Sequence, residues 1–336
     1  MPNTFRVAAV QAEPVWLDAQ ATVDKTIGLI EDAAAQGVAL VAFPETWIPG
    51  YPAFLWLGSV FGQVPYVARY HANSPTTDGE HLAAVRDAAR RTGVTVALGY
   101  SEKDHGTLYM AQTVIGPDGE ILLHRRKLKP THVERSLFGE SDGSHLRVVD
   151  SPLGRIGALN CWEHLQPLVK YAMYAQHEQV HIAAWPAFGL AKGIAYALGA
   201  EANMAVTQTY ALEGGCFVIA PTQVISERGV EAFVTTDEQR PFLTAGSGNS
   251  RIFGPDGTPL GEPLDEHAEG LVVADIDLSL IDLAKNAADP AGHYARTDAT
   301  RLVHDDRPKP AVVRPGGSTG PHFPDLDEPD RDGAAV

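Results

Sequence analysis

Residues 155–185, RIGALNCWEHLQPLVKYAMYAQHEQVHIAAW, alternate between strand-like and helical segments. The run RIGALN (155–160) predicts a strand, residues 164–177 predict a helix, and VHIAAW (180–185) predicts a second strand. A strand, a helix and a further strand in this order form a βαβ unit. This stretch therefore predicts an α/β fold.

The flanking segments continue the alternation and add hairpins. Further strands are expected at 5–12, 38–44, 94–100, 216–221 and 271–277, helices at 19–36, 79–92 and 192–212, and hairpins at 108–127 and around 255–260. This mixture predicts sheets flanked by helices in one domain, residues 1–304. Residues 305–336 contain six prolines, four glycines and seven acids, a composition that predicts a flexible tail.

Composition excludes several classes of protein. Of the 336 residues, 44% are hydrophobic, which excludes a disordered chain, and the net charge of −16 makes nucleic acid an unfavourable partner. Two cysteines are too few for a disulfide scaffold, and the N-terminal residues lack the layout of a secretory signal. We therefore expect a cytoplasmic globular protein.

Glu45 is the single charged residue between positions 33 and 68. Prolines at 49, 52 and 65 interrupt this apolar stretch, so it predicts no membrane span. The stretch is expected to be buried or to line a pocket. A carboxylate in such surroundings requires a cationic or hydrogen-bonding partner.

Cys161 follows one predicted strand and precedes a helix. At a helix N-terminus the dipole favours the thiolate, although a free cysteine can equally be buried and inert. Cys216 has apolar neighbours on both sides in GGCFVIAP and is expected to be a core residue.

Residues 177–181, HEQVH, match the zinc-protease pattern H-E-x-x-H. That chemistry requires both histidines on one face of a continuous helix. Because His181 opens the apolar run HIAAWP, the helix is expected to end between His177 and His181. We therefore expect no metal site, and a zinc hydrolase is the alternative that this motif leaves open.

Three segments together resemble the nitrilase family of the carbon–nitrogen hydrolases. They are FPETW (43–47), RKLKPT (126–131) and NCWE (160–163), and the resemblance extends from about residue 5 to 303, including DPAGHYARTD (289–298). It implies a catalytic Glu45, Lys127 and Cys161, with Glu134 as a fourth residue seven positions after Lys127. Taken alone, Lys127 would be a solvated surface lysine, and Glu134 an exposed partner of Arg135.

The resemblance also implies a fold, an assembly and a reaction. The fold is a four-layer αββα sandwich of two mixed sheets, which pairs into an αββα-αββα homodimer or a longer spiral. The reaction is hydrolysis of a small-molecule nitrile to the acid and ammonia through a thioimidate and a thioester on Cys161. Glu45 is the general base, with a pKa raised by its uncharged surroundings and partly offset by Lys127, while Lys127 and the Trp162 backbone N–H stabilise the intermediates. No step requires a metal or an organic cofactor.

Aromatic residues are candidates for the substrate pocket. Seven lie between positions 47 and 70, and Tyr51, Trp162 and Trp185 are the expected substrate-binding residues. Each of these aromatics can instead pack in the core or at a subunit interface. The sequence leaves open an aryl nitrile, an alkyl nitrile or cyanide as substrate. An amidase on the same site, or a catalytically inactive binding protein, also remains open.

Overall fold

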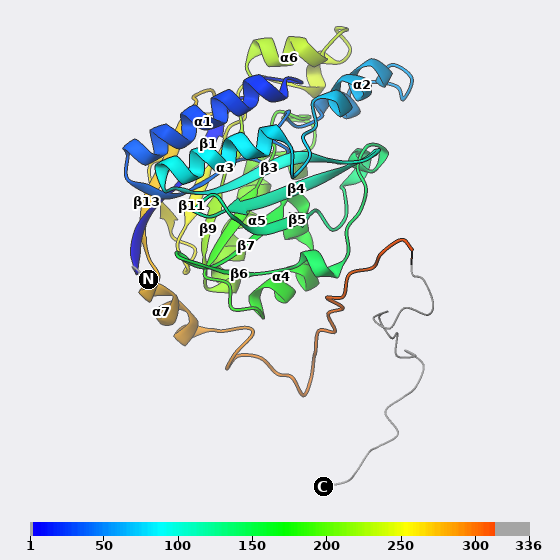
Figure 1. Ribbon diagram of the computed structural model, residues 1–336. Coiled ribbons are helices and arrows are strands. Elements are labelled where there is room, and N and C mark those ends of the chain that lie inside the picture. Colours follow the sequence, from blue (N-terminus) through cyan, green and yellow to red (C-terminus); the bar gives the residue numbers. More distant parts are fainter. Residues whose placement is uncertain (1–2, 313–336) are drawn as a thin grey trace.

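The computed structural model describes residues 3–312, in which two β-sheets pack against each other between layers of helices (Figure 1). The larger sheet has the strand order β10-β1-β2-β3-β4-β5, and β13 also pairs with β1. Its strands are β1 (Thr4–Ala12), β2 (Val38–Ala42), β3 (Thr95–Asp104), β4 (Thr107–Ile115), β5 (Ile121–Arg126), β10 (Thr222–Gln223) and β13 (Gly270–Asp277). Parallel pairing of β1 with β2 and of β2 with β3, beside antiparallel β3, β4 and β5, makes this sheet mixed.

The smaller sheet has the order β12-β11-β9-β8-β7-β6 and is also mixed. Its strands are β6 (Val149–Ser151), β7 (Gly154–Asn160), β8 (Val180–Ala184), β9 (Phe217–Ala220), β11 (Arg251–Phe253) and β12 (Pro259–Leu260). Strands β7, β8 and β9 run parallel, as the βαβ pattern of residues 155–185 predicts.

Alternating side chains of the central strands separate the layers. In β1, Val7 and Ala9 belong to the core between the two sheets, together with Ile156 of β7. Ala8 and Val10 face the other way, into the core under α1 (Ala19–Ala35) and α3 (Glu80–Thr92). This two-residue period is the normal consequence of the pleat.

Two helices cover the outer face of the smaller sheet, α4 (Pro167–Tyr174) and α5 (Ala200–Gly214), and share a core with strands β7 to β9. The molecule is therefore a four-layer αββα sandwich, as predicted. Three other helices, α2 (Val64–Ala72), α6 (Glu227–Phe233) and α7 (Ser279–Ala287), were not anticipated. Among residues 3–312, no helix combines the length and the apolar content needed to cross a bilayer.

The predictions for two helices need correction. The helix expected at 192–212 begins only at Ala200, because Gly193 has a φ of +77° and Gly199 is extended at the N-cap. The helix expected at 164–177 is divided at Pro167: a short 3₁₀ helix, η4 (Cys161–Leu165), precedes it and α4 follows. Proline is favourable at the first turn of a helix but not inside one, which explains the division.

The start of the predicted tail contacts the domain. The backbone N–H of Lys309 donates to Asp142 at 2.7 Å, and directly before the tail Nε2 of His304 lies 3.1 Å from the carbonyl oxygen of Gly143. The rest of the predicted tail, 313–336, lies outside the described residues. The domain boundary at residue 304 therefore stays a prediction. The homodimer stays a prediction as well.

Candidate active site

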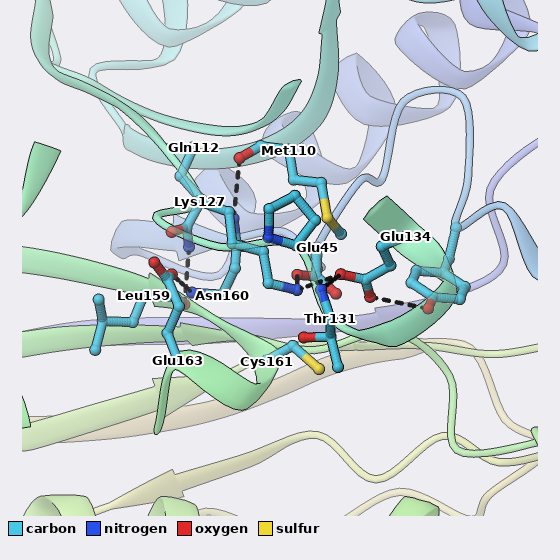
Figure 2. Close-up of polar contacts among 12 residues, drawn as sticks. Glu45, Met110, Gln112, Lys127, Thr131, Glu134, Leu159, Asn160, Cys161 and Glu163 are labelled. Atoms are coloured by element: carbon cyan, nitrogen blue, oxygen red, sulfur yellow. Dashed lines mark hydrogen bonds and ion pairs between the residues drawn. The ribbon is translucent and has the colours of Figure 1, made fainter. Parts of the chain in front are cut away.

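Three strand ends bring the predicted residues together. Glu45 lies three residues beyond β2, Lys127 directly follows β5, and Cys161 directly follows β7. Strands β2 and β5 belong to the larger sheet and β7 to the smaller one, so the group forms only where the two sheets meet. Figure 2 shows these side chains and Glu134 pointing toward one another.

Lys127 lies between two carboxylates in a site closed to solvent. Its Nζ is 2.9 Å from Oε1 of Glu45 and 2.9 Å from Oε2 of Glu134 (Figure 2). Burial alone lowers the pKa of Lys127, but the negative charges of Glu134 and Glu45 outweigh it and raise that pKa above its ordinary value. The ammonium group therefore stays charged. The alternative of a solvated surface lysine is therefore wrong.

Local structure holds the Glu134 carboxylate in place. It caps the 3₁₀ helix η2 (His132–Ser136), with Oε2 accepting from the backbone N–H of Thr131 at 2.6 Å. Oε1 accepts from the Tyr51 hydroxyl at 2.9 Å. Glu134 is 1% exposed, so the alternative of an exposed pair with Arg135 is wrong.

Glu45 has one paired and one unpaired carboxylate oxygen. Oε1 accepts from Lys127, whereas the buried Oε2 has no hydrogen-bond partner. Burial raises the pKa of Glu45 to about 8, the charge of Lys127 opposes this, and the charge of Glu134 adds to it. The lone charge of the apolar stretch thus has the cationic partner that the sequence required. The pKa of Glu45 is also raised, as its uncharged surroundings predicted.

Cys161 begins η4 with a φ of +48°, in the left-handed region. Burial raises the pKa of its thiol well above the ordinary value, and the charge of Glu45 adds to this; the charge of Lys127 and the backbone N–H of Trp162 act in the opposite direction. The expectation that a helix dipole favours the thiolate is therefore wrong here. Its helix is a five-residue 3₁₀ turn, and neighbouring carboxylates and burial outweigh it. Cys216 is a fully buried core residue, as predicted.

Glu163 links the two strand ends that carry Lys127 and Cys161. Its Oε1 accepts from the backbone N–H of Leu128 at 2.8 Å, and its Oε2 accepts from that of Asn160 at 2.7 Å. The carboxylate thus joins β5 to β7 directly beside the reactive side chains. Glu163 was not predicted as a site residue, although the spacing from Asn160 to Glu163 is that of a capping box; no local pattern marks its contact with Leu128.

A cavity of about 40 Å³ lies against Cys161 and Glu134. The three expected binding residues, Tyr51, Trp162 and Trp185, all line it. Its other lining residues were not singled out by the sequence as binding residues: Trp56, Thr131, Pro186, Ala187, Phe188, Leu190, Leu198 and Asn203.

The seven aromatic residues between positions 47 and 70 lie in different environments in the folded protein. Tyr51 and Trp56 line the cavity, whereas Trp47 and Tyr70 are fully buried core residues and Phe61 is 89% exposed. Asn203 reaches the site on α5, where its side-chain oxygen accepts from the Trp162 indole at 2.9 Å. No local sequence signal marks this contact, because 41 positions separate the partners.

The HEQVH segment does not form the zinc-protease helix. Helix α4 ends at Tyr174, His177 is exposed with a φ of +57°, and His181 is buried in β8. No continuous helix carries both histidines, as predicted, but α4 ends before His177 and not between the two: His177 lies in the turn after α4. Among residues 3–312, no group of three or more His, Cys, Asp and Glu side chains is arranged to hold a metal ion.

Comparison with known proteins finds similar sequences over most of the chain. The carbon–nitrogen hydrolase family profile matches residues 6–286. The chain is 54% identical over 313 residues to a nitrilase of Pseudomonas syringae pv. syringae (93% of each chain), and 53% identical over 306 residues to an aliphatic nitrilase of Rhodococcus rhodochrous (91% of this chain and 84% of that one). It is also 48% identical over 300 residues to an arylacetone-specific nitrilase of Alcaligenes faecalis (89% and 84%).

Solved structures share the fold at low sequence identity. A carbon–nitrogen hydrolase from Helicobacter pylori G27 superposes with a TM-score of 0.71 at 19% identity, covering 89% of this chain and all of that one. The C. elegans NitFhit protein superposes with a TM-score of 0.69 at 20% identity, covering 92% of this chain and 69% of that one.

Proposed function

The chain belongs to the nitrilases of the carbon–nitrogen hydrolase family, and we propose that it converts a nitrile to the carboxylic acid and ammonia through a covalent bond to Cys161. One observation carries the residue assignment: a buried lysine bridges two carboxylates beside a buried cysteine. A charged group that is costly to bury is retained where chemistry uses it.

The first step needs a base, because the Cys161 thiol is protonated at neutral pH. Glu45 is suited to this role, since its Oε2 has no partner and its pKa of about 8 lies close to the working pH. Glu45 takes the thiol proton as the sulfur attacks the nitrile carbon. Lys127 and the Trp162 backbone N–H stabilise the charge that develops on the nitrile nitrogen, which then receives the former thiol proton from Glu45 to give the thioimidate.

Water completes the reaction in two further additions. Glu45 takes a proton from the first water as it adds to the thioimidate and passes that proton to the nitrogen. The remaining hydroxyl proton of this tetrahedral intermediate reaches the nitrogen in the same way, so ammonia leaves and a thioester remains. A second water, activated in the same way, releases the acid and restores the thiol. Overall, one nitrile and two water molecules give one carboxylic acid and one ammonia molecule. Glu134 holds Lys127 in place throughout.

The cavity supports a small organic nitrile as substrate. Tyr51, Trp162 and Trp185 offer apolar faces beside Cys161, which suits the carbon chain or ring attached to the cyano group. Named relatives include an aliphatic nitrilase and an arylacetone-specific one, so both classes belong in the test.

The experiment measures ammonia release from aliphatic, aromatic and arylacetonitrile substrates, from cyanide, and from the amides that match each nitrile. We expect turnover of nitriles and a mass adduct on Cys161 in a quenched reaction. Turnover of amides alone would show an amidase instead. Activity that survives alkylation of the thiol but is lost to a chelator would favour the zinc hydrolase, and absence of both turnover and adduct would favour a binding protein.

A further inference from the structure

A buried chain of hydrogen bonds leads away from the backbone carbonyl of the nucleophile. Nδ1 of His164 lies 2.6 Å from the carbonyl oxygen of Cys161, and Nε2 of His164 lies 2.9 Å from Nε2 of His181. Nδ1 of His181 lies 2.7 Å from Oε1 of Glu178, whose Oε2 accepts from the Tyr210 hydroxyl at 2.7 Å. The four side chains are at most 1% exposed. Two of them belong to the HEQVH segment, which the proposed mechanism does not use.

The first acceptor fixes the protons along this chain. A carbonyl oxygen can only accept, so Nδ1 of His164 carries a hydrogen. Burial, together with the neighbouring His181, lowers the pKa of His164 well below its ordinary value, so its ring is neutral and its Nε2 is an acceptor. Nε2 of His181 must therefore donate. The carboxyl group of Glu178 then shares the remaining hydrogen with Nδ1 of His181.

The bond to the Cys161 carbonyl also determines where the next N–H points. The Cys161 carbonyl and the Trp162 N–H belong to one planar trans peptide unit and point in opposite directions. The Trp162 N–H acts on the Cys161 sulfur, where it lowers the thiol pKa. Holding the carbonyl therefore holds this N–H toward the reacting atoms. A hydrogen bond to the carbonyl also polarises the peptide and makes its N–H a stronger donor.

Two further features require such support. Cys161 has a φ of +48°, a strained conformation for a residue with a side chain, which persists only where the surroundings hold it. The imidazole rings are themselves fixed, since His164 stacks on Trp185 and His181 stacks on Tyr210. Neither ring is among the side chains that line the cavity. Their effect must therefore reach the substrate through the peptide that they hold.

We propose that His164, His181 and Glu178 are positioning residues that orient the Trp162 backbone N–H toward the negative charge of the transition state. This rests on the proposed function, in which that N–H stabilises the charge. The three residues do not touch the substrate. They act on the rate of the chemical step and leave substrate binding nearly unchanged.

Two substitutions at one position test the proposal. In His164→Asn the amide nitrogen takes the place of Nδ1, so the variant retains the donor to Cys161 and loses the contact with His181 and the stacking on Trp185, a ring contact that His164→Gln loses too. In His164→Gln the amide oxygen takes the place of Nε2 and accepts from His181, so the donor to the Cys161 carbonyl is lost. We expect kcat per acylated site to fall about tenfold or more in His164→Gln with KM nearly unchanged, and only a few-fold in His164→Asn.

A second pair tests the far end of the chain. In Glu178→Gln the amide oxygen accepts from Tyr210 and the amide nitrogen donates to His181, so the direction of the bonds survives and kcat stays within a few-fold. Glu178→Leu breaks the chain and lowers kcat. Equal values of kcat per acylated site for His164→Asn and His164→Gln would overturn the proposal, because a purely structural role lowers the number of active sites and not the rate at each.

A spectroscopic measurement separates this proposal from the proposed function. Nitrogen NMR of ¹⁵N-histidine-labelled protein without substrate is expected to show His164 neutral with its hydrogen on Nδ1. A hydrogen on Nε2 instead would overturn the proposal even if nitriles are hydrolysed. Conversely, a wild-type chain that forms no adduct on Cys161 refutes the proposed function, and the tautomer still decides whether the hydrogen-bond chain exists.

Discussion

Glu45→Gln is expected to remove the catalytic base and to stabilise the fold above neutral pH. The carboxyl group is fully buried, and its pKa is raised from an ordinary value of 4.5 to about 8. As pH rises through this window, the unfolded chain releases the proton before the folded chain does. The folded state is therefore favoured at low pH, and Glu45 costs stability progressively between about pH 4.5 and pH 8.

The magnitude follows from these two values. Each pH unit of difference corresponds to about 1.4 kcal/mol, so ionisation of Glu45 costs about 1 kcal/mol of stability at pH 5 and on the order of 4 kcal/mol at pH 8. The amide of the variant has no such cost. It keeps an oxygen for Lys127, and Lys127 keeps its bond to Glu134 at 2.9 Å. The free energy of unfolding of the variant, relative to wild type, should therefore rise by about 3 kcal/mol from pH 5 to pH 8.

Urea unfolding of both chains at pH 5 and pH 8, at one protein concentration, measures this change. Acylation of Cys161 should fall 10²- to 10⁴-fold in the variant, as expected for loss of a general base. Glu269→Gln is the matched control, because Glu269 pairs with Lys25 at the surface and should change the pH dependence little. A stability difference for Glu45→Gln that is independent of pH, or that shrinks toward pH 8, would refute the reasoning.

Three further predictions concern the nucleophile and the assembly. Cys161→Ala should abolish turnover and leave unfolding by urea nearly unchanged, whereas Cys216→Ala should remain active at a core cost of about 1 kcal/mol; a tenth of the wild-type rate in Cys161→Ala would exclude the covalent mechanism. In the Cys216→Ala background, iodoacetamide should modify Cys161 slowly at pH 7 and faster at higher pH, because burial raises the thiol pKa; a fast rate that does not vary between pH 6 and pH 9 would contradict this. Light scattering at micromolar concentration should show a homodimer or a larger assembly, and a monomer would contradict this. Truncation after residue 304 should leave single-turnover acylation near normal; a truncated chain that assembles normally but is not acylated would contradict that expectation.

The residues themselves determined the layers of the fold. Apolar runs such as 5–12 and 180–185 are strands because few other structures bury both faces of so short a segment, and local composition is sufficient to identify them. The same reasoning failed at 192–199, where the glycine conformations at Gly193 and Gly199 outweigh the helical spacing of the apolar residues.

The sequence also determined the chemical character of the site. A single carboxylate at Glu45 within 36 nearly uncharged residues required a buried partner, and the segments around Lys127 and Cys161 identified the group by their resemblance to a family. The sequence could not identify which oxygen of Glu45 is free. It could not show that burial protonates Cys161 either, because burial is a property of the packed molecule.

Contacts between distant positions were decided by the tertiary structure alone. Lys127 meets Glu45 across 82 positions, and the hydrogen-bond chain behind Cys161 ends at Tyr210 on α5. HEQVH matches a metal-site pattern in sequence, but in the folded chain its His181 contacts His164 next to Cys161, and its Glu178 contacts His181. The physical reason is that strand ends and helices far apart in the chain become neighbours only when the sheets form and pack, and no local pattern of residues records that distance.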